Sequence, residues 1–379
     1  MFNETVDRTV VEGEKWGRYK GQDVIPMWVA DTDFKAPKSV IDALQKRVEH
    51  GVFGYTDVDK ETNQAVVDFI KRHYNWQIES SWIVWLPGVV SGMNITCRAI
   101  DTQDVITTTP IYPHFIKAPK DANQNVITVP LKEKNNRWTV DFEEFEEAIS
   151  STCRLFMLCN PHNPGGTVFT KDELKKFADI CVKHDLIVCS DEIHADLILN
   201  KNIKHIPIAS LNSDILKRTI TLLAPSKTYN IAGLQSSYAV IPDVNLRKQF
   251  KKTLGSLTSQ INLLAITATK TAYSECDEWL YELRKYLKEN LDIVKDFVKN
   301  EPKIKMLDQD ATYLAWIDVS ELKLNNPYEY FLSYGIGVSE GDRFGDKNFV
   351  RLNFGTTKSL LKEGLKRVKK AIDFLHNPL

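Results

Sequence analysis

The chain has 379 residues, of which 43% are hydrophobic and 26% are charged, values that are ordinary for a globular protein of two or more domains. Its 49 basic residues balance 50 acidic ones, and the net charge of −1 argues against nucleic acid or an anionic membrane surface as a partner. No run approaches the roughly 18 apolar residues of a membrane span, and the first residues lack the features of a signal peptide, so we expect no membrane contact and a cytoplasmic location.

Helices and strands alternate between about residues 62 and 242. The expected strands are 83–86, 104–108, 126–130, 154–159, 186–190, 220–223 and 237–241, and the expected helices are 61–76, 91–100, 141–150 and 171–184. This alternation predicts an α/β fold whose large domain has a mostly parallel seven-stranded sheet sandwiched by helices. Ligands of such sheets bind beyond the carboxyl ends of the strands, so we expect the functional site there.

After residue 242 the pattern changes to long helices and short strands. We expect helices over 243–274, 277–299, 328–334 and 358–374, and strands over 303–307, 312–318 and 349–353. This part of the chain predicts a smaller α+β domain, and the helix 277–299 is long enough to span the join between the two domains.

The six cysteines, at positions 97, 153, 159, 181, 189 and 276, form no C-x-x-C pair. Four of them fall in or near apolar runs. We therefore expect buried thiols in a reducing compartment, and the sequence supports no zinc or other metal site.

Three motifs each follow one of the expected strands. They are C-N-P-H-N-P-G-G at 159–166, S-D-E-I-H at 190–194 and A-P-S-K-T-Y-N-I-A-G-L-Q at 224–235. Lys227 in the last motif stands between a buried strand and a glycine-containing turn, which suits an amine that forms a Schiff base better than a solvated charge. Taken alone, Lys227 would more often be a surface lysine at the start of a helix.

Together these motifs resemble the cofactor site of the aspartate-aminotransferase-type enzymes, the fold type I (aminotransferase class I/II) family that uses pyridoxal 5'-phosphate. The resemblance implies a Schiff base of pyridoxal 5'-phosphate on Lys227, which also serves as the base for the Cα proton. It places Asp191 at the pyridine nitrogen, and Asn163 and His194 at the ring oxygen. Turn capping by Asp191, turn formation by Asn163 and a purely structural His194 are the alternatives.

The phosphate end of the cofactor site is expected at G-V-V, residues Gly88, Val89 and Val90, where a helix opens after a strand. Backbone N–H groups and the helix dipole would cradle the phosphate there, helped by the Ser226 hydroxyl. Gln235 replaces an arginine that many aminotransferases carry, so the phosphate must depend more on these groups.

Further family positions are matched on the substrate side and at a subunit interface. Tyr112 matches the aromatic residue that stacks on the pyridine ring, with a core tyrosine as the alternative. Tyr55 matches a tyrosine that reaches the phosphate from the partner subunit, which implies a homodimer with shared sites. Arg351 lies in an apolar strand and matches the arginine that binds the α-carboxylate of an amino acid, although a structural ion pair is the alternative.

The run M-W-V-A-D-T-D-F at 27–34 resembles the W-V-A-D-M-D-F segment of the carbon–sulfur β-lyases, the cystathionine β-lyase type, and we place Asp31 within it on the substrate side. The resemblance implies cleavage of L-cystathionine or an S-substituted L-cysteine to pyruvate, ammonia and a thiol. An aminotransferase of the same fold is the main alternative, and a non-catalytic regulator is a further one.

Some positions depart from the lyase pattern, namely Thr32, His114, Arg343 and the run G-T-T-K-S at 355–359. They put the particular substrate in doubt and leave the cofactor chemistry intact. In this family the N-terminal segment packs with the C-terminal part, which implies a large domain of 46–275 and a small discontinuous domain of 1–45 with 276–379.

Overall fold

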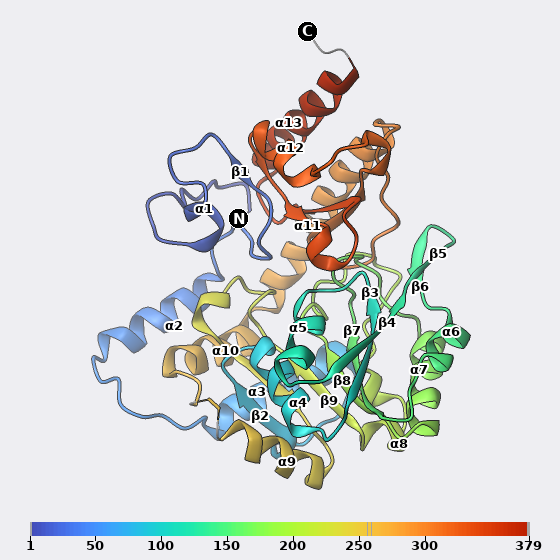
Figure 1. The fold of residues 1–379 in the computed structure, drawn as a ribbon. Coiled ribbons are helices and arrows are strands. Elements are labelled where there is room, and N and C mark those ends of the chain that lie inside the picture. Colours follow the sequence, from blue (N-terminus) through green and yellow to red (C-terminus); the bar gives the residue numbers. More distant parts are fainter. Residues whose placement is uncertain (1, 256, 259, 377–379) are drawn as a thin grey trace.

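A seven-stranded sheet forms the centre of the larger part of the molecule, shown in Figure 1 as a computed structural model that describes residues 2–255, 257–258 and 260–376. Across the sheet the strands are β2 (Ile83–Leu86), β10 (Ser237–Val240), β9 (Thr219–Leu223), β8 (Ile187–Asp191), β7 (Cys153–Cys159), β3 (Asp104–Thr109) and β4 (Asn125–Pro130). Strand β10 is antiparallel to both of its neighbours, and the remaining pairs are parallel. The predicted mostly parallel sheet of seven strands is therefore confirmed.

Helices cover both faces of this sheet. They are α3 (Lys60–Tyr74), α4 (Val89–Ala99), α5 (His114–Asp121), α6 (Phe142–Glu147), α7 (Lys171–Lys183), α8 (Ser213–Leu216), α9 (Val244–Leu254) and α10 (Leu263–Glu275). Successive side chains of a strand point to opposite faces, and β7 shows the consequence. Leu155 and Met157 belong to the buried cluster under α4, whereas Phe156 and Leu158 belong to the cluster under α7.

The N-terminal segment lies beside the C-terminal elements, as the blue and red ribbons of Figure 1 show. Strand β1 (Ile25–Pro26) pairs in parallel with β12 (Ile336–Gly337). The neighbouring antiparallel sheet has the order β11 (Leu314–Asp318), β14 (Phe349–Asn353) and β13 (Ser339–Glu340). This pairing supports a discontinuous small domain, while the boundaries at residues 46 and 275 stay a prediction.

Six further helices and strand pairs of the described chain complete the fold, and α11 is the longest of these elements. They are α1 (Glu14–Gly17), α2 (Lys38–Glu49), the hairpin of β5 (Lys132–Lys134) and β6 (Arg137–Thr139), α11 (Asp277–Lys299), α12 (Pro327–Ser333) and α13 (Lys358–His376). Within the residues described, none of the helices combines the length and apolar character needed to cross a membrane.

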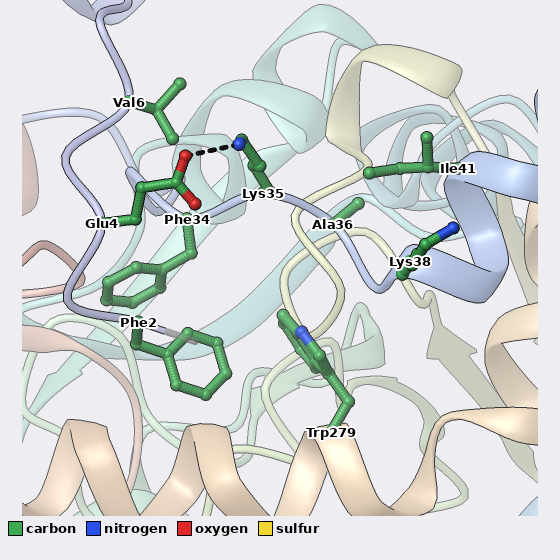
Figure 2. A pocket seen from close by; sticks show the side chains of 9 residues that line it. All are labelled: Phe2, Glu4, Val6, Phe34, Lys35, Ala36, Lys38, Ile41 and Trp279. Carbon is green, nitrogen blue, oxygen red and sulfur yellow. Dashed lines mark hydrogen bonds and ion pairs between the residues drawn. The ribbon is translucent and has the colours of Figure 1, made fainter.

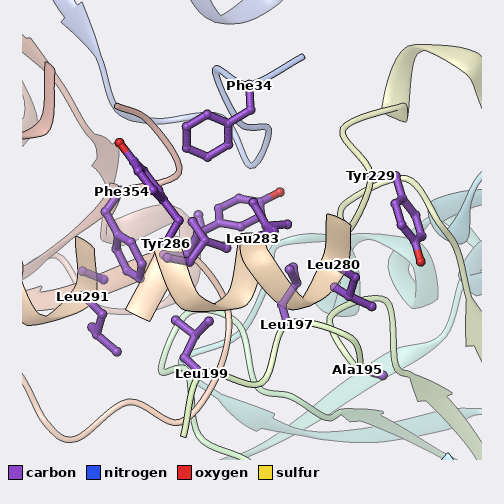
Figure 3. Close-up of a cluster of buried hydrophobic side chains, with 14 of the residues drawn as sticks. Phe34, Ala195, Leu197, Leu199, Tyr229, Leu280, Leu283, Tyr286, Leu291 and Phe354 are labelled. Carbon is purple, nitrogen blue, oxygen red and sulfur yellow. The ribbon is translucent and has the colours of Figure 1, made fainter. Parts of the chain in front are cut away.

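Helix α11 joins the two parts of the molecule, as Figure 3 shows. Its residues Leu280, Leu283 and Leu291 are fully buried along one side of the helix. Around them lie side chains from both parts of the chain: Ala195, Leu197, Leu199 and Tyr229 from the large-sheet part, and Phe34 and Phe354 from the N-terminal and C-terminal segments. Because this cluster is continuous, the N-terminal and C-terminal segments pack against the same helix as the large-sheet part.

Aromatic contacts hold the N-terminal segment on α11 (Figure 2). The Phe2 ring meets Phe34 edge-on at a centroid distance of 5.0 Å and Trp279 at 5.3 Å. A cavity of about 270 Å³ remains beside these rings. The ion pair of Lys35 with Glu4, 2.6 Å long, lies at its edge and is solvent-exposed. The packing fixes the run 28–34 against the rest of the molecule.

The fold corrects two expectations for secondary structure and adds two helices. The helix expected over 243–274 is two helices, α9 and α10, because Asn262 accepts a hydrogen bond from the Ala265 N–H and so caps a new helix start. The strand expected over 303–307 is a single bridge between Lys305 and Asp318. Helices α2 and α5 were not predicted, and Pro119 inside α5 is a residue that argues against helix in a sequence.

Candidate active site

A cavity of about 670 Å³ opens at the carboxyl ends of β7, β8 and β9. The N-terminal run around Ala30 and the C-terminal strand β14 contribute the opposite wall. The predicted site residues that line this cavity are Gly88, Val89, Val90, Tyr112, Asn163, Asp191, His194, Ser226, Lys227 and Arg351. Residues from widely separated motifs therefore meet at one place.

Lys227 lies in the loop after β9, and its Nζ donates a hydrogen bond to the Ala30 carbonyl oxygen at 2.8 Å. The Asn230 side chain fixes this geometry, because it accepts from the Thr32 N–H at 3.1 Å and donates to the Phe34 carbonyl at 2.7 Å. Burial lowers the pKa of Lys227, and the nearby Arg351 adds to that effect, against a raising effect of Asp31. A lysine whose pKa is lowered in this way is a better nucleophile and base near neutral pH.

Asp191 ends β8 and is buried at the floor of the cavity. Its Oδ1 accepts a hydrogen bond from the Ile193 N–H at 3.1 Å. Burial raises the pKa of Asp191 to about 7. Among the residues that the structure describes, no cationic side chain forms an ion pair with this carboxylate. A buried carboxylate of this kind suits a cationic ring nitrogen, which would supply the missing charge.

The raised pKa of Asp191 predicts how the cofactor-free protein responds to pH. The folded-state pKa of about 7 exceeds the value of about 3.9 for an unfolded chain, so between these values the folded protein binds more protons. The free energy of unfolding should therefore fall as pH rises from about 4 to about 7. Replacing Asp191 with Asn should remove a few kcal/mol of this pH dependence, measured by urea unfolding of the apoprotein at several pH values. An unchanged pH profile in D191N would contradict the assignment.

Arg351 on β14 brings the two sides of the cavity together. Its Nη1 donates to Asn163 Oδ1 at 3.0 Å, and its Nη2 donates to the Trp28 carbonyl oxygen at 2.9 Å. The guanidinium also lies 4.5 Å from the centre of the Phe344 ring. Burial lowers the pKa of Arg351 to about 10. Within the described ranges, no carboxylate pairs with this guanidinium and its Nε has no hydrogen-bond partner, so a buried positive charge is left for an anionic ligand.

His194 is buried beside these groups, in the turn that follows Asp191. Burial lowers the pKa of His194 to about 3, and the charges of Lys227 and Arg351 add to the effect. The imidazole is therefore neutral near pH 7. Its Nδ1 finds no partner in the part of the chain that the structure describes, which leaves a buried polar atom for a ligand.

The start of α4 forms another wall of the cavity. Gly88 stands at the N-cap with an extended backbone, and in the described chain no side chain caps the helix, so the first N–H groups, from Val89 onward, have no intrahelical partner. Helix α4 approaches the sheet closely, because a Cβ on Gly92 would lie 2.8 Å from Leu222 Cδ2. The free N–H groups and the helix dipole fit a phosphate, and Ser226 lines the same cavity.

Two predicted site residues do not line the cavity. Tyr55 is fully exposed on the loop between α2 and α3. The Asp31 carboxylate pairs with Arg8 at 2.8 Å and lies 3.5 Å from Lys15 Nζ. These cations pair with the carboxylate, and Asp31 is not among the residues that line the cavity, so its contact with substrate stays a prediction. Its backbone neighbour Ala30 provides the contact with Lys227 instead.

The cavity also includes residues that the sequence reasoning did not place there. Glu14, Trp28, Ser339 and Phe344 all line it. Trp28 belongs to the motif at 27–34, so the sequence contained a signal that could have placed Trp28 at the site. Glu14 lies in a polar N-terminal stretch that no motif marks, and only the packing of the N-terminal segment brings it to the site.

Comparisons with known proteins agree with this geometry. A model of the family described as aminotransferase class I and II matches residues 22–368. Cystathionine beta-lyase PatB of Bacillus subtilis is 36% identical, with 98% of this chain and 99% of the relative covered. The crystal structure of OvoB is 41% identical with a TM-score of 0.96, covering 98% of this chain and 99% of that one. The crystal structure of cystalysin from Treponema denticola, which contains pyridoxal 5'-phosphate, is 34% identical with a TM-score of 0.95 and 99% of each chain covered. The chain therefore belongs to the aminotransferase class I and II family, as its motifs predicted.

Proposed function

We propose that the protein is a pyridoxal-phosphate-dependent carbon–sulfur β-lyase of the cystathionine β-lyase type. It cleaves L-cystathionine or S-substituted L-cysteines to pyruvate, ammonia and a thiol. The observation that carries this proposal is the meeting of Lys227, Asp191 and the uncompensated guanidinium of Arg351 in one cavity. The name of the full-length relative PatB, a cystathionine beta-lyase, supports the same reaction class, and the pyridoxal 5'-phosphate in the cystalysin structure supports the cofactor.

The residues present fit the cofactor. Asp191 would hold the ring nitrogen, and Asn163 and His194 would face the ring oxygen, with the unpartnered His194 Nδ1 as the supporting observation. Tyr112 would cover a face of the ring. The N–H groups at Gly88, Val89 and Val90, with Ser226, would hold the phosphate.

The chemistry divides between cofactor and protein. When bound, pyridoxal phosphate supplies an electron sink for the bond pair left at Cα. Arg351 binds the α-carboxylate through its planar fork and so orients the Cα–H bond. The Lys227 amine removes the Cα proton, and the thiolate then leaves from Cβ with the electron pair of the C–S bond. Water hydrolyses the three-carbon product to pyruvate and ammonia, and the thiolate takes up a proton.

A homodimer is part of this proposal. Family resemblance assigns Tyr55 to the phosphate of the partner subunit, and three side chains of its loop, Val52, Phe53 and Tyr55, are exposed to solvent. Exposed aromatic residues side by side are the kind of surface that a second subunit would cover. A cytoplasmic location is proposed with it, because all six cysteines are free thiols and buried.

Removing the Tyr55 hydroxyl should weaken cofactor binding. In Y55F we expect the dissociation constant of pyridoxal phosphate to rise about tenfold, the usual effect of one charge-assisted hydrogen bond. The constant is measured by titrating the apoprotein with cofactor and following protein fluorescence. Tyr281→Phe, the same change at an exposed tyrosine of α11 that does not line the cavity, serves as the control and should keep the wild-type constant. If the dissociation constant of pyridoxal phosphate is unchanged in Y55F at protein concentrations where the dimer forms, Tyr55 does not contact the phosphate.

The main alternative, an aminotransferase, differs only in how the same carbanion partitions. A hundredfold preference for elimination over transamination requires a difference of only about 2.7 kcal/mol between the two activation barriers. Small changes in the site can therefore decide which reaction occurs. The W-V-A-D run and the histidine at position 194 favour the lyase. A non-catalytic regulator should have lost at least one of the cofactor residues. The chain retains Lys227, Asp191 and Asn163, and all three line the cavity.

Turnover without a keto acid separates these reactions. The holoenzyme is given L-cystathionine or S-propyl-L-cysteine with no keto acid, and free thiol is followed with a chromogenic thiol reagent. The lyase should release thiol at a constant rate over many turnovers. An enzyme that releases no thiol, and whose cofactor changes absorbance once and recovers only after a keto acid is added, would be an aminotransferase and would overturn the proposal.

A further inference from the structure

Asp196 is a buried carboxylate that the proposed reaction does not use. It is 3% exposed and is not among the residues that line the active-site cavity. Its chain neighbours Ala195 and Leu197 pack in the cluster around α11 (Figure 3). Arg284 of that helix donates a hydrogen bond from Nε to the Asp196 carbonyl oxygen. Within the described ranges, no cationic side chain forms an ion pair with the carboxylate, so this buried anion depends on neutral hydrogen-bond donors.

Two hydroxyl groups donate to the Asp196 carboxylate. Thr228, which directly follows Lys227 in the loop after β9 (residues 224–231, the lysine loop), donates from Oγ1 to Oδ2 at 2.8 Å. Tyr74, the last residue of α3, donates from its phenol to Oδ1. Burial raises the pKa of Tyr74 well above its usual range and the charge of Asp196 adds to that effect, so the phenol stays protonated and remains a donor. One carboxylate therefore joins the end of α3 to the lysine loop.

The same carboxylate joins the lysine loop to the two residues proposed to contact the cofactor ring, Asp191 and His194. These residues and Asp196 belong to the short segment 191–196 at the end of β8, where backbone hydrogen bonds of 2.9 Å keep the chain in tight turns. Thr228 is fully buried and bonded to this segment. Because Lys227 is its neighbour in the chain, the Thr228 hydrogen bond fixes the backbone of Lys227 relative to the ring-contact residues.

A second anchor holds the lysine loop to the N-terminal segment. The Asn230 side chain is bonded to the backbone of the run 28–34, as described above. Lys227 lies in the chain between Thr228 and the end of β9, and its amine donates to the Ala30 carbonyl of that run. The contacts with the N-terminal segment relate the lysine to the small-domain side of the cavity, whereas the contact with Asp196 relates it to the ring-contact residues.

We propose that Asp196 is a positioning residue for Lys227, and that its hydrogen bonds with Thr228 and Tyr74 set where the amine stands relative to the ring-contact residues. With this bridge in place, the amine reaches the aldehyde carbon of the cofactor and afterwards the Cα proton of the substrate. In the described chain, none of the three bridge residues lines the cavity, so they act through Lys227 and not on substrate. The inference rests on the proposed function for the proton transfer, but attachment of the cofactor to the lysine tests it whatever the reaction.

Substitutions at Thr228 separate the hydrogen bond from the packing. Thr228→Val keeps the shape of the side chain and removes the donor to Asp196, whereas Thr228→Ser keeps the donor and loses a methyl group. Thr221→Val is the matched control, because Thr221 is fully buried on β9 and its hydroxyl has no partner among the described residues. Tyr74→Phe removes the other donor without changing the lysine loop, and it decides the test if T228V does not fold.

The rate at which pyridoxal phosphate attaches to the apoprotein reports the position of the Lys227 amine. Attachment is followed by the absorbance of the cofactor. It is compared with the affinity for pyridoxamine 5'-phosphate, which has an amine in place of the aldehyde and cannot attach. T228V should attach the cofactor about tenfold more slowly, the usual effect of one hydrogen bond to a charged group, and Y74F should also be slower. T228S and T221V should keep the wild-type rate, and all four variants should keep the wild-type affinity for pyridoxamine 5'-phosphate.

Thiol release from S-propyl-L-cysteine by the holoenzyme gives a second readout. In T228V we expect kcat to fall about tenfold while KM stays within about twofold, because the carboxylate site at Arg351 is untouched. If the wild type releases no thiol, the proposed lyase function fails, and the attachment rates still decide the role of Asp196.

Three results would overturn the positioning role. The first is a wild-type attachment rate in T228V, or in Y74F if T228V does not fold. The second is an equal slowing in T228S or T221V, which would trace the effect to packing rather than to the hydrogen bond. The third is a parallel loss of affinity for pyridoxamine 5'-phosphate, which would show a general disturbance of the cofactor site and no specific effect on Lys227.

Discussion

Replacing Lys227 with alanine should reduce thiol release from S-propyl-L-cysteine by about 10³-fold or more, because the change removes both the attachment point of the cofactor and the base for the Cα proton. The loss should appear in kcat, since the carboxylate site at Arg351 is untouched. The position of Lys227 supports this expectation. Its amine reaches the Ala30 carbonyl across the cavity, and burial and Arg351 lower its pKa.

Rescue by a small amine separates chemistry from folding. Methylamine added to K227A should restore part of the rate, in proportion to its free-base concentration, since it can enter the space left by the side chain and accept the proton. Lys204→Ala, an exposed lysine outside the cavity, is the control and should keep full activity. Wild-type turnover in K227A would exclude Lys227 as the catalytic residue.

Replacing Arg351 should have the second largest effect, and it should fall on substrate binding. Truncation of one partner of a buried charge pair costs about 2–5 kcal/mol, so we expect kcat/KM of R351A to fall by about 10²–10³-fold, mostly through KM. R351K keeps the charge but not the planar fork, so its kcat/KM should lie between the values of the wild type and R351A. Steady-state kinetics with S-propyl-L-cysteine, which has a single carboxylate, give this comparison without interference from a second charged group.

The absorbance spectrum of the cofactor shows whether R351A disturbs the cofactor site rather than substrate binding. Arg351 also donates a hydrogen bond to Asn163, so its loss could disturb the cofactor site. If R351A retains the wild-type absorbance and cofactor affinity while KM rises, the residue binds substrate. An unchanged KM with a weakened cofactor site would instead assign Arg351 a structural role.

The sequence predicted the part of the site that depends on local motifs. Parallel strands place their carboxyl ends at one edge of a sheet, so the residues after β7, β8 and β9 had to meet once the alternation of helices and strands was recognised. That rule brings the motifs of Lys227, Asp191 and Asn163 to one edge of the sheet, and the resemblance to the fold type I family gave these residues their roles. Arg351 could be singled out because a charge inside an apolar strand needs a partner.

Other features depend on contacts between distant segments, which local patterns do not report. The carboxylate of Asp31 pairs with Arg8 and Lys15 of the N-terminal segment, and Asp31 does not line the cavity. Glu14 reaches the cavity only through the packing of the N-terminal segment. The break between α9 and α10 was missed because helix propensity on both sides of it is high, and the cap at Asn262 is one residue among many polar ones.

The fate of the substrate nitrogen tests the central claim most directly. The holoenzyme is given L-cystathionine labelled with ¹⁵N on the amino group of its cysteine half, in the presence of 2-oxoglutarate as a competing acceptor, and the products are analysed by mass spectrometry. A carbon–sulfur β-lyase releases the label as ammonium, with equal amounts of pyruvate and thiol, at a rate that does not depend on 2-oxoglutarate. Label that appears in glutamate, at a rate that rises with 2-oxoglutarate, would contradict the account and identify an aminotransferase.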